Sequence, residues 1–148
     1  MAAPLDQAAV VLLVGRLIRV LRFGGKRLIV EDNPGARKVI RNLVASVAGE
    51  ICECADGAGV LALLRRERPD FVLMDIQMEG VDGITATRQV KAVDPTARVI
   101  IVTDYDQPDL REAAYQAGAC GYVSKENLLE LVRLLKEFDE EGGKHTEK

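Results

Sequence analysis

The stretch Phe71–Gly83, FVLMDIQMEGVDG, places an acidic residue directly after a short apolar run. An apolar run of this kind, bounded by turn residues, is typical of a buried β-strand. Asp75 ends the predicted strand, and the glycine-containing loop after it leads into a helical segment that follows Asp82 and Gly83. The stretch therefore predicts a strand and a helix with an acid at the junction.

The same alternation of strand and helix runs through the chain from Arg27 onward. The predicted strands are Leu28–Glu31, Ile51–Ala55, Phe71–Asp75, Val99–Thr103 and Gly121–Ser124. Strict alternation with short loops predicts an α/β fold, a doubly wound parallel sheet of five strands with five helices. Ligands of such sheets bind beyond the carboxyl ends of the strands.

The predicted helices carry their own start signals and apolar stripes. Asn33 is suited to cap a helix that begins at Pro34. The apolar stripe of that helix is Val39, Ile40, Leu43, Val44 and Val47. Later helices follow Asp56, Asp82-Gly83 and Pro108, and the last carries Leu128, Leu131, Val132 and Leu135. These stripes can pack against a sheet.

Composition indicates one ordinary globular domain. The chain has 148 residues, of which 48% are apolar and 29% are charged. Its net charge of −3 combines +4 in residues 1–27 with −7 in the remainder. An acidic body does not attract nucleic acid, so we expect no direct DNA binding by this chain.

The cysteines indicate a reducing compartment. Cys52, Cys54 and Cys120 form neither an even disulfide framework nor a paired metal motif, which predicts a cytoplasmic protein. Cys52 and Cys54 alternate on a predicted strand, and we expect both to pack as small apolar side chains. The single histidine, His145, lies in a polar tail, so histidine-based catalysis is not expected.

Residues 1–25 form a separate N-terminal extension, followed by a domain at 26–138 and a polar tail at 139–148. The apolar run from Ala8 to Phe23 is interrupted by Arg16, Arg19 and Arg22, which opposes a membrane-spanning helix. Two interpretations stay open. The extension is either an amphipathic helix for a partner or a membrane surface, or an appendage without function.

Polar residues stand at the carboxyl ends of four predicted strands. They are Glu31 and Asp32, then Asp75, Thr103 and Lys125. Clustered carboxylates cannot ionise together comfortably without a cation, and oxygen ligands with open positions suit Mg²⁺. The acids therefore predict a magnesium site.

This set of residues can also transfer a phosphoryl group. A carboxylate such as Asp75 can act as a nucleophile and form an aspartyl phosphate when a metal and a cation neutralise the transferring group. Thr103 could donate a hydrogen bond to one phosphoryl oxygen, and Lys125 could pair with another.

The segments LIVEDN, VLMDIQMEGVDG, IIVT and GYVSK, in this order, resemble the response-regulator receiver family of two-component systems over Lys26–Phe138. The resemblance implies a flavodoxin-like sheet of order 2-1-3-4-5. It implies that Glu31 and Asp32 are the acidic pair, Asp75 the phosphoacceptor, and Thr103 and Lys125 the switch hydroxyl and lysine. It also implies that the backbone carbonyl of Gln77 binds the metal and that Tyr122 turns inward on activation.

The resemblance further implies the partners. A histidine kinase or a phosphotransfer protein would supply the phosphoryl group. An output protein, or a second copy of the chain, would bind the face formed by the fourth helix, fifth strand and fifth helix. The sequence is most similar to receivers that precede a helix-turn-helix domain, but only ten residues follow Phe138. The chain is then either a stand-alone receiver or a fragment of a longer regulator.

The sequence departs from the family pattern near the phosphoacceptor. Glu79 replaces a usual proline, and Asp104 replaces a small residue after Thr103. Asp104 and the bulky Tyr105 could form a gate that slows phosphorylation and hydrolysis. The alternative is that Asp104 points to solvent and caps the next helix.

Three other functions share some of these sequence features. A haloacid-dehalogenase-like phosphatase needs a second acid two residues after the nucleophile, where this chain has Gln77. A flavodoxin needs a phosphate-binding loop after the first strand, but EDNPG is acidic. A phosphorylation-independent interaction module stays open, although the intact acidic set argues against it.

Overall fold

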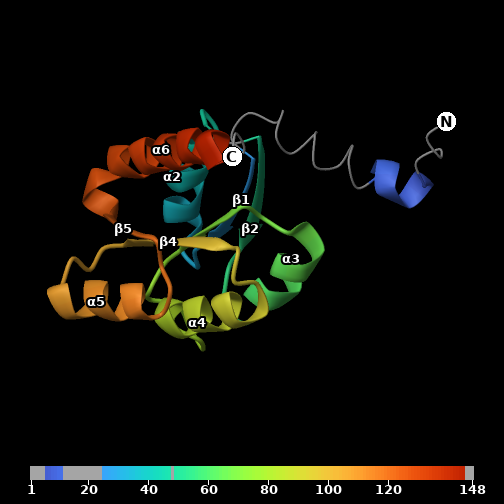
Figure 1. Cartoon of the computed structure of the whole chain (residues 1–148). Coiled ribbons are helices and arrows are strands. Elements are labelled where there is room, and N and C mark those ends of the chain that lie inside the picture. The colour runs from blue at the N-terminus through green and yellow to red at the C-terminus, as the bar shows by residue number, and fades with distance from the viewer. Residues whose placement is uncertain (1–5, 12–24, 48, 146–148) are drawn as a thin grey trace.

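Five short apolar runs pair side by side to form the central sheet. The computed structural model describes residues 6–11, 25–47 and 49–145 (Figure 1). The strands are β1 Lys26–Val30, β2 Glu50–Cys54, β3 Phe71–Met74, β4 Arg98–Thr103 and β5 Gly121–Ser124. All neighbouring pairs are parallel and the order is β2-β1-β3-β4-β5, which confirms the predicted topology. Glu31, Ala55 and Asp75 were predicted inside strands but lie just beyond them.

Five helices cover the two faces of this sheet. They are α2 Pro34–Val44, α3 Val60–Glu67, α4 Gly83–Val93, α5 Pro108–Gln116 and α6 Leu129–His145. In Figure 1, α2 and α6 lie over one face, and α3, α4 and α5 lie over the other. A 3-10 turn, Lys125–Asn127, joins β5 to α6. The predicted fourth and fifth helices of the receiver are therefore α5 and α6.

Alternate strand residues build two apolar layers. In β3, Val72 and Met74 pack with α3, α4 and α5, whereas Phe71 and Leu73 pack with α2 and α6. All four are at most 1% exposed. Fully burying one such side chain contributes about 1.5–3 kcal/mol, so the central strand is a rigid base for the residue that follows it, Asp75.

Side-chain caps fix the starts of α2 and α4, at the predicted cap Asn33 and at Asp82. Asn33 Oδ1 accepts a hydrogen bond from Ala36 N at 3.0 Å. Asp82 Oδ1 accepts hydrogen bonds from Ile84 N and Thr85 N, both at 2.9 Å. These bonds satisfy N–H groups that would otherwise lack a partner at a helix start. They therefore fix the residues at which α2 and α4 begin.

Three apolar residues differ from the predicted stripes. Val47 was predicted on the first helix but lies beyond α2, which ends at Val44. Val39 is 51% exposed, because Ile40 and Val44 form the buried side of α2 and Val39 lies about 100° around the helix from Ile40. Leu128 precedes α6 but still packs against the layer that contains Leu131. Cys54 is buried and Cys52 half-buried, as expected of packing cysteines.

The ends of the chain are described only in part. Residues 7–11 are helical, but residues 12–24, which carry the arginines of the predicted amphipathic helix, lie outside the described residues. α6 continues to His145, through much of the predicted polar tail. Among the helices in the described part of the chain, none has the length and apolar character needed to cross a membrane.

Candidate functional site

The predicted site residues meet at the carboxyl ends of the strands. Glu31 and Asp32 follow β1, Asp75 follows β3, Thr103 is the last residue of β4, and Lys125 follows β5. Because β1, β3, β4 and β5 are consecutive parallel strands across the sheet, their ends open on one crevice. The structure thus brings all five residues to one edge of the sheet.

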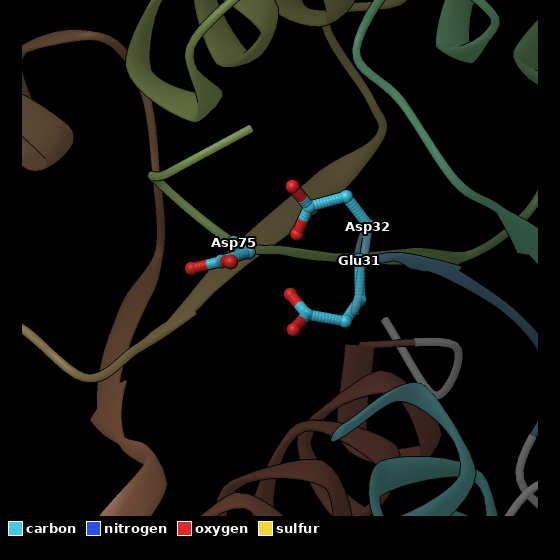
Figure 2. Close-up of side chains that lie close together, drawn as sticks. All are labelled: Glu31, Asp32 and Asp75. Carbon is cyan, nitrogen blue, oxygen red and sulfur yellow. The ribbon is translucent and has the colours of Figure 1, made fainter. Parts of the chain in front are cut away.

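Three carboxylates lie together in this crevice. Figure 2 shows the side chains of Glu31, Asp32 and Asp75 lying close to one another. One oxygen from each of the three lies within 4.8 Å of the other two. Glu31 is 1% exposed and Asp75 is 6% exposed, whereas Asp32 is open to solvent. The cluster therefore has a buried base and one accessible side.

Lys125 bridges the two buried acids. Its ammonium lies 2.9 Å from Glu31 Oε1 and 3.3 Å from Asp75 Oδ2. Glu31 Oε2 is buried and has no hydrogen-bond partner among the residues that the structure describes. A buried carboxylate oxygen without a partner carries a desolvation cost, so the crevice holds one ligand position that the protein does not satisfy.

The electrostatics follow from this arrangement. Burial, together with the neighbouring Asp75, raises the pKa of Glu31 to about 7, and Lys125 offsets this only in part. Burial lowers the pKa of Lys125, but the hydrogen bond to Glu31 and the charge of Asp75 outweigh burial, so its pKa is raised. The pocket thus favours a charged ammonium and would favour an added cation.

The donor set fits Mg²⁺. The three clustered carboxylates offer hard oxygen ligands on a partly open site, and Glu31 Oε2 supplies an oxygen to which no described residue hydrogen-bonds. Gln77 is exposed, and its side chain accepts a hydrogen bond from Tyr105. The role of its backbone carbonyl stays a prediction.

The other side of the crevice is closed by hydrogen bonds. Thr103 is fully buried, and its Oγ1 accepts a hydrogen bond from Tyr105 N at 3.2 Å. Tyr122 is 3% exposed, and its hydroxyl donates to the carbonyl oxygen of Tyr105. Tyr122 is therefore already turned inward, packed on α5, with the guanidinium of Arg111 4.8 Å from the centre of its ring.

Asp104 lies at the rim of the crevice. Its side chain is 69% exposed, and Oδ2 lies 3.9 Å from Lys125 Nζ. The N-cap of α5 is Gln107, so the expectation that Asp104 caps this helix is wrong. The reason is that the loop runs three residues beyond Asp104 before α5 begins at Pro108.

Two features of the loops were not predicted. Gly83 N donates to the carbonyl oxygen of Ile76 at 2.8 Å, and a Cβ at Gly83 would lie only 1.9 Å from the carbonyl oxygen of Asp75. The hydroxyl of Tyr105 donates to Gln77 Oε1 at 3.0 Å, which links the loops after β4 and β3. Glycine at 83 is visible in the sequence, but neither contact has a sequence signal.

Comparison with known proteins agrees with this geometry. The family model described as the response regulator receiver domain matches residues 28–136. Sporulation initiation phosphotransferase F of Bacillus subtilis is 33% identical over 100 residues, covering 68% of this chain and 81% of that protein. Response regulator GacA of Pseudomonas aeruginosa is 35% identical over 115 residues, covering 76% of this chain. The chain spans only 54% of the length of GacA.

Solved structures give the same result. A two-component response regulator of the LuxR family from Aurantimonas sp. SI85-9A1 superposes with a TM-score of 0.73 at 33% identity, covering 78% of this chain and 84% of that one. Domains of this family bind Mg²⁺ at an acidic pocket, and the Glu31, Asp32 and Asp75 cluster lies where such a pocket is expected. The chain belongs to the response regulator receiver domain family.

Proposed function

We propose that this chain accepts a phosphoryl group on Asp75 from a histidine kinase or a phosphotransfer protein, with Mg²⁺ bound by Glu31, Asp32 and Asp75. The observation that carries the proposal is the position of the Asp75 carboxylate. It lies 3.3 Å from the Lys125 ammonium and within 4.8 Å of the two other acids. A carboxylate in such surroundings can attack phosphorus while positive charge is held close to the reaction.

The reaction transfers one phosphoryl group between two carriers. A carboxylate oxygen of Asp75 attacks phosphorus, and the bond from phosphorus to the donor nitrogen or oxygen breaks with its electron pair remaining on the donor. Lys125 can turn its ammonium from Glu31 toward a phosphoryl oxygen. Thr103 can donate its hydroxyl hydrogen to another. Bound Mg²⁺ would neutralise part of the negative charge on the phosphoryl group during transfer.

The loop that contains Asp104 and Tyr105 favours slow phosphorylation of Asp75 and slow hydrolysis of the aspartyl phosphate. Asp104 adds a negative charge 3.9 Å from Lys125, and the hydroxyl of Tyr105 reaches Gln77 across the crevice. The charge of Asp104 opposes the entry of an anionic donor, and the bulk of the two side chains opposes the entry of hydrolytic water. We therefore propose that these two residues act as an access gate, with a long-lived aspartyl phosphate as the result.

Phosphorylation would act through binding partners. Receiver domains generally are not enzymes, and they interact with kinases or phosphotransfer proteins and with output domains. For this chain we propose self-phosphorylation and hydrolysis of the aspartyl phosphate as its only reactions. The output partner, or a second copy, would bind the face formed by α5, β5 and α6. The side chains of Arg111, Glu112 and Tyr115 on α5 are exposed and could contact such a partner.

We also propose the limits of the receiver domain and the cellular compartment in which it works. The receiver would span residues 26–138, with residues 1–25 and 139–148 outside it. The thiols of Cys52, Cys54 and Cys120 are all free, which suits the reducing cytoplasm predicted from the sequence.

Intact-protein mass spectrometry after incubation with acetyl phosphate and Mg²⁺ tests the proposal. Wild type should gain the mass of one phosphoryl group, and Asp75→Ala should gain none. Glu79→Ala, an exposed carboxylate in the same loop, is the matched control and should behave as wild type. Equal phosphoryl uptake by Asp75→Ala would place the acceptor elsewhere. No uptake by wild type from acetyl phosphate or a phosphorylated histidine donor would favour a phosphorylation-independent interaction module.

A further inference from the structure

Tyr105 makes hydrogen bonds to three separate parts of the crevice. Its backbone N–H donates to Thr103 Oγ1 at 3.2 Å, and its side-chain hydroxyl donates to Gln77 Oε1 at 3.0 Å. Its carbonyl oxygen accepts the hydroxyl hydrogen of Tyr122. One loop residue therefore contacts the end of β4, the loop after β3 and the interior of β5.

The inward position of Tyr122 is held by the chain's own side chains. The guanidinium of Arg111 lies 4.8 Å from the centre of the Tyr122 ring, and Asp106 holds that guanidinium through a contact of 3.0 Å. The Tyr122 ring packs in the apolar layer of α3, α4 and α5. A cation over an aromatic face and a hydroxyl bound to a backbone carbonyl both stabilise this rotamer. A phosphoryl group takes part in none of these contacts.

Thr103 can connect the loop to the phosphoacceptor at the same time. A hydroxyl has one donor hydrogen and two acceptor lone pairs. Thr103 Oγ1 uses one lone pair for Tyr105 N, so its hydrogen is available for a phosphoryl oxygen on Asp75. A shift of Thr103 toward that oxygen would then pull on the backbone of Tyr105 directly.

We propose that Tyr105 is the positioning residue of this switch: it holds Tyr122 inward before phosphorylation and transmits the movement of Thr103 through the loop backbone. The inference rests on the proposed function, because it concerns the response to an aspartyl phosphate. It departs from the expectation of the family resemblance, in which the aromatic turns inward on activation. In this chain the aromatic is set in advance, and the loop after β4 is the part that moves.

Fluorine NMR with fluorotyrosine tests the proposal, because the chain contains only three tyrosines. They are Tyr105, Tyr115 and Tyr122, and single Tyr→Phe variants assign the signals. Tyr115 is 45% exposed and serves as the internal reference. A soluble gadolinium chelate broadens signals in proportion to their exposure. In wild type with EDTA and no phosphodonor, the Tyr122 signal should be broadened several-fold less than the Tyr115 signal.

Two variants remove the same hydrogen bond from opposite ends. Tyr105→Phe and Gln77→Leu both abolish the bond between the loops, and each should increase broadening of the Tyr122 signal while leaving that of Tyr115 unchanged. Their double variant should show no more than either alone. Wild-type Tyr122 as exposed as Tyr115, or full protection of Tyr122 in both variants, would overturn the proposal.

The response to phosphorylation is measured on the same samples. Addition of acetyl phosphate and Mg²⁺ should shift the Tyr105 signal of wild type more than the Tyr122 signal, and Thr103→Ala should lose the Tyr105 shift. Intact mass then reports whether Asp75 carries phosphate. Protection of Tyr122 without any mass gain would defeat the proposed function but leave the inward position established. A mass gain with an exposed Tyr122 would defeat the inference alone.

Discussion

The acid side of the crevice, formed by Glu31, Asp32 and Asp75, and its switch side, formed by Thr103, Tyr105 and Tyr122, satisfy their polar groups differently. On the acid side Glu31 Oε2 is buried with no hydrogen-bond partner in the described part of the chain, and the pKa of Glu31 is raised to about 7. On the switch side the hydroxyls of all three residues take part in hydrogen bonds within the chain.

The acid side would be stabilised by an added ligand, whereas the switch side is already stabilised by hydrogen bonds within the chain. Three carboxylates share one nearby ammonium, so the acid side gains most from an added cation. The switch side has no such deficit, and its resting geometry follows from loop contacts. A phosphoryl group on Asp75 would join the two sides, because Lys125 and Thr103 could both bind it.

The largest expected effect tests the backbone that supports the acid side. Gly83→Ala should destabilise the protein by more than about 3 kcal/mol, because its Cβ would lie 1.9 Å from the carbonyl oxygen of Asp75 and neither backbone segment can yield cheaply. Urea unfolding measures the change. Gly80→Ala is the control, since no atom of the described residues lies within 4 Å of the position of its Cβ and only its φ of 83° is unfavourable. A cost of about 1 kcal/mol is expected there. Equal costs would mean that the loop after β3 is not tightly held.

The second prediction concerns the raised pKa of Glu31. The native pKa of about 7 exceeds the unfolded value of 4.5, so the folded state binds more protons between these values. The resulting stabilisation is fully present below pH 4.5 and is lost as pH rises through 7. Without metal, the free energy of unfolding should fall by up to about 3 kcal/mol from this group across that window.

Urea unfolding in EDTA at several pH values measures this loss. Glu31→Gln cannot titrate at this position and should lack the decline, so the difference between the two pH profiles isolates the group. Parallel profiles would show that Lys125 already keeps Glu31 ionised in the native state, and the acid side would then resemble the switch side in being internally balanced.

Removal of the accessible acid should weaken the metal site without disturbing the fold. Asp32 is exposed, so Asp32→Ala should leave stability nearly unchanged but lower the Mg²⁺ affinity by about thirtyfold. Isothermal titration with MgCl₂ measures this. Glu79→Ala, an exposed carboxylate outside the cluster, should change the affinity by less than about twofold. An unchanged affinity in Asp32→Ala would move the metal site away from the acid side.

The acid side could be predicted from sequence, and the reason is geometric. An apolar run such as Phe71–Met74 predicts a strand, and the alternation of strands with helices brings the strand ends to one edge. Any carboxylate directly after such a run is then placed in the crevice regardless of its rotamer. Glu31, Asp32 and Asp75 needed no further information, and the strand ends were predicted to within two residues.

The switch side could be predicted only in part. Thr103 and Lys125 follow the same strand rule, but the bond from Tyr105 to Gln77 depends on side-chain rotamers in two loops that are far apart in sequence. The inward rotamer of Tyr122 depends likewise on the side chain of Arg111, which lies over its ring and is held by Asp106. Val39 shows the same limit, because an apolar residue next to a buried stripe can still face solvent.

The smallest expected effect concerns Asp104, which lies between the two sides. Its carboxylate is 69% exposed but still 3.9 Å from Lys125 Nζ, close to the path that a phosphodonor must take. Solvent screens an exposed charge, so its repulsion of an anionic donor should slow phosphorylation only about threefold. Asp104→Ala should therefore speed up phosphorylation by acetyl phosphate by about that factor, and the loss of side-chain bulk should also speed up attack by water on the aspartyl phosphate. Asp104→Asn keeps the size and removes the charge, so agreement between the two variants assigns the effect to charge. Rates within about twofold of wild type for both variants would eliminate the gate and leave Asp104 as a surface residue.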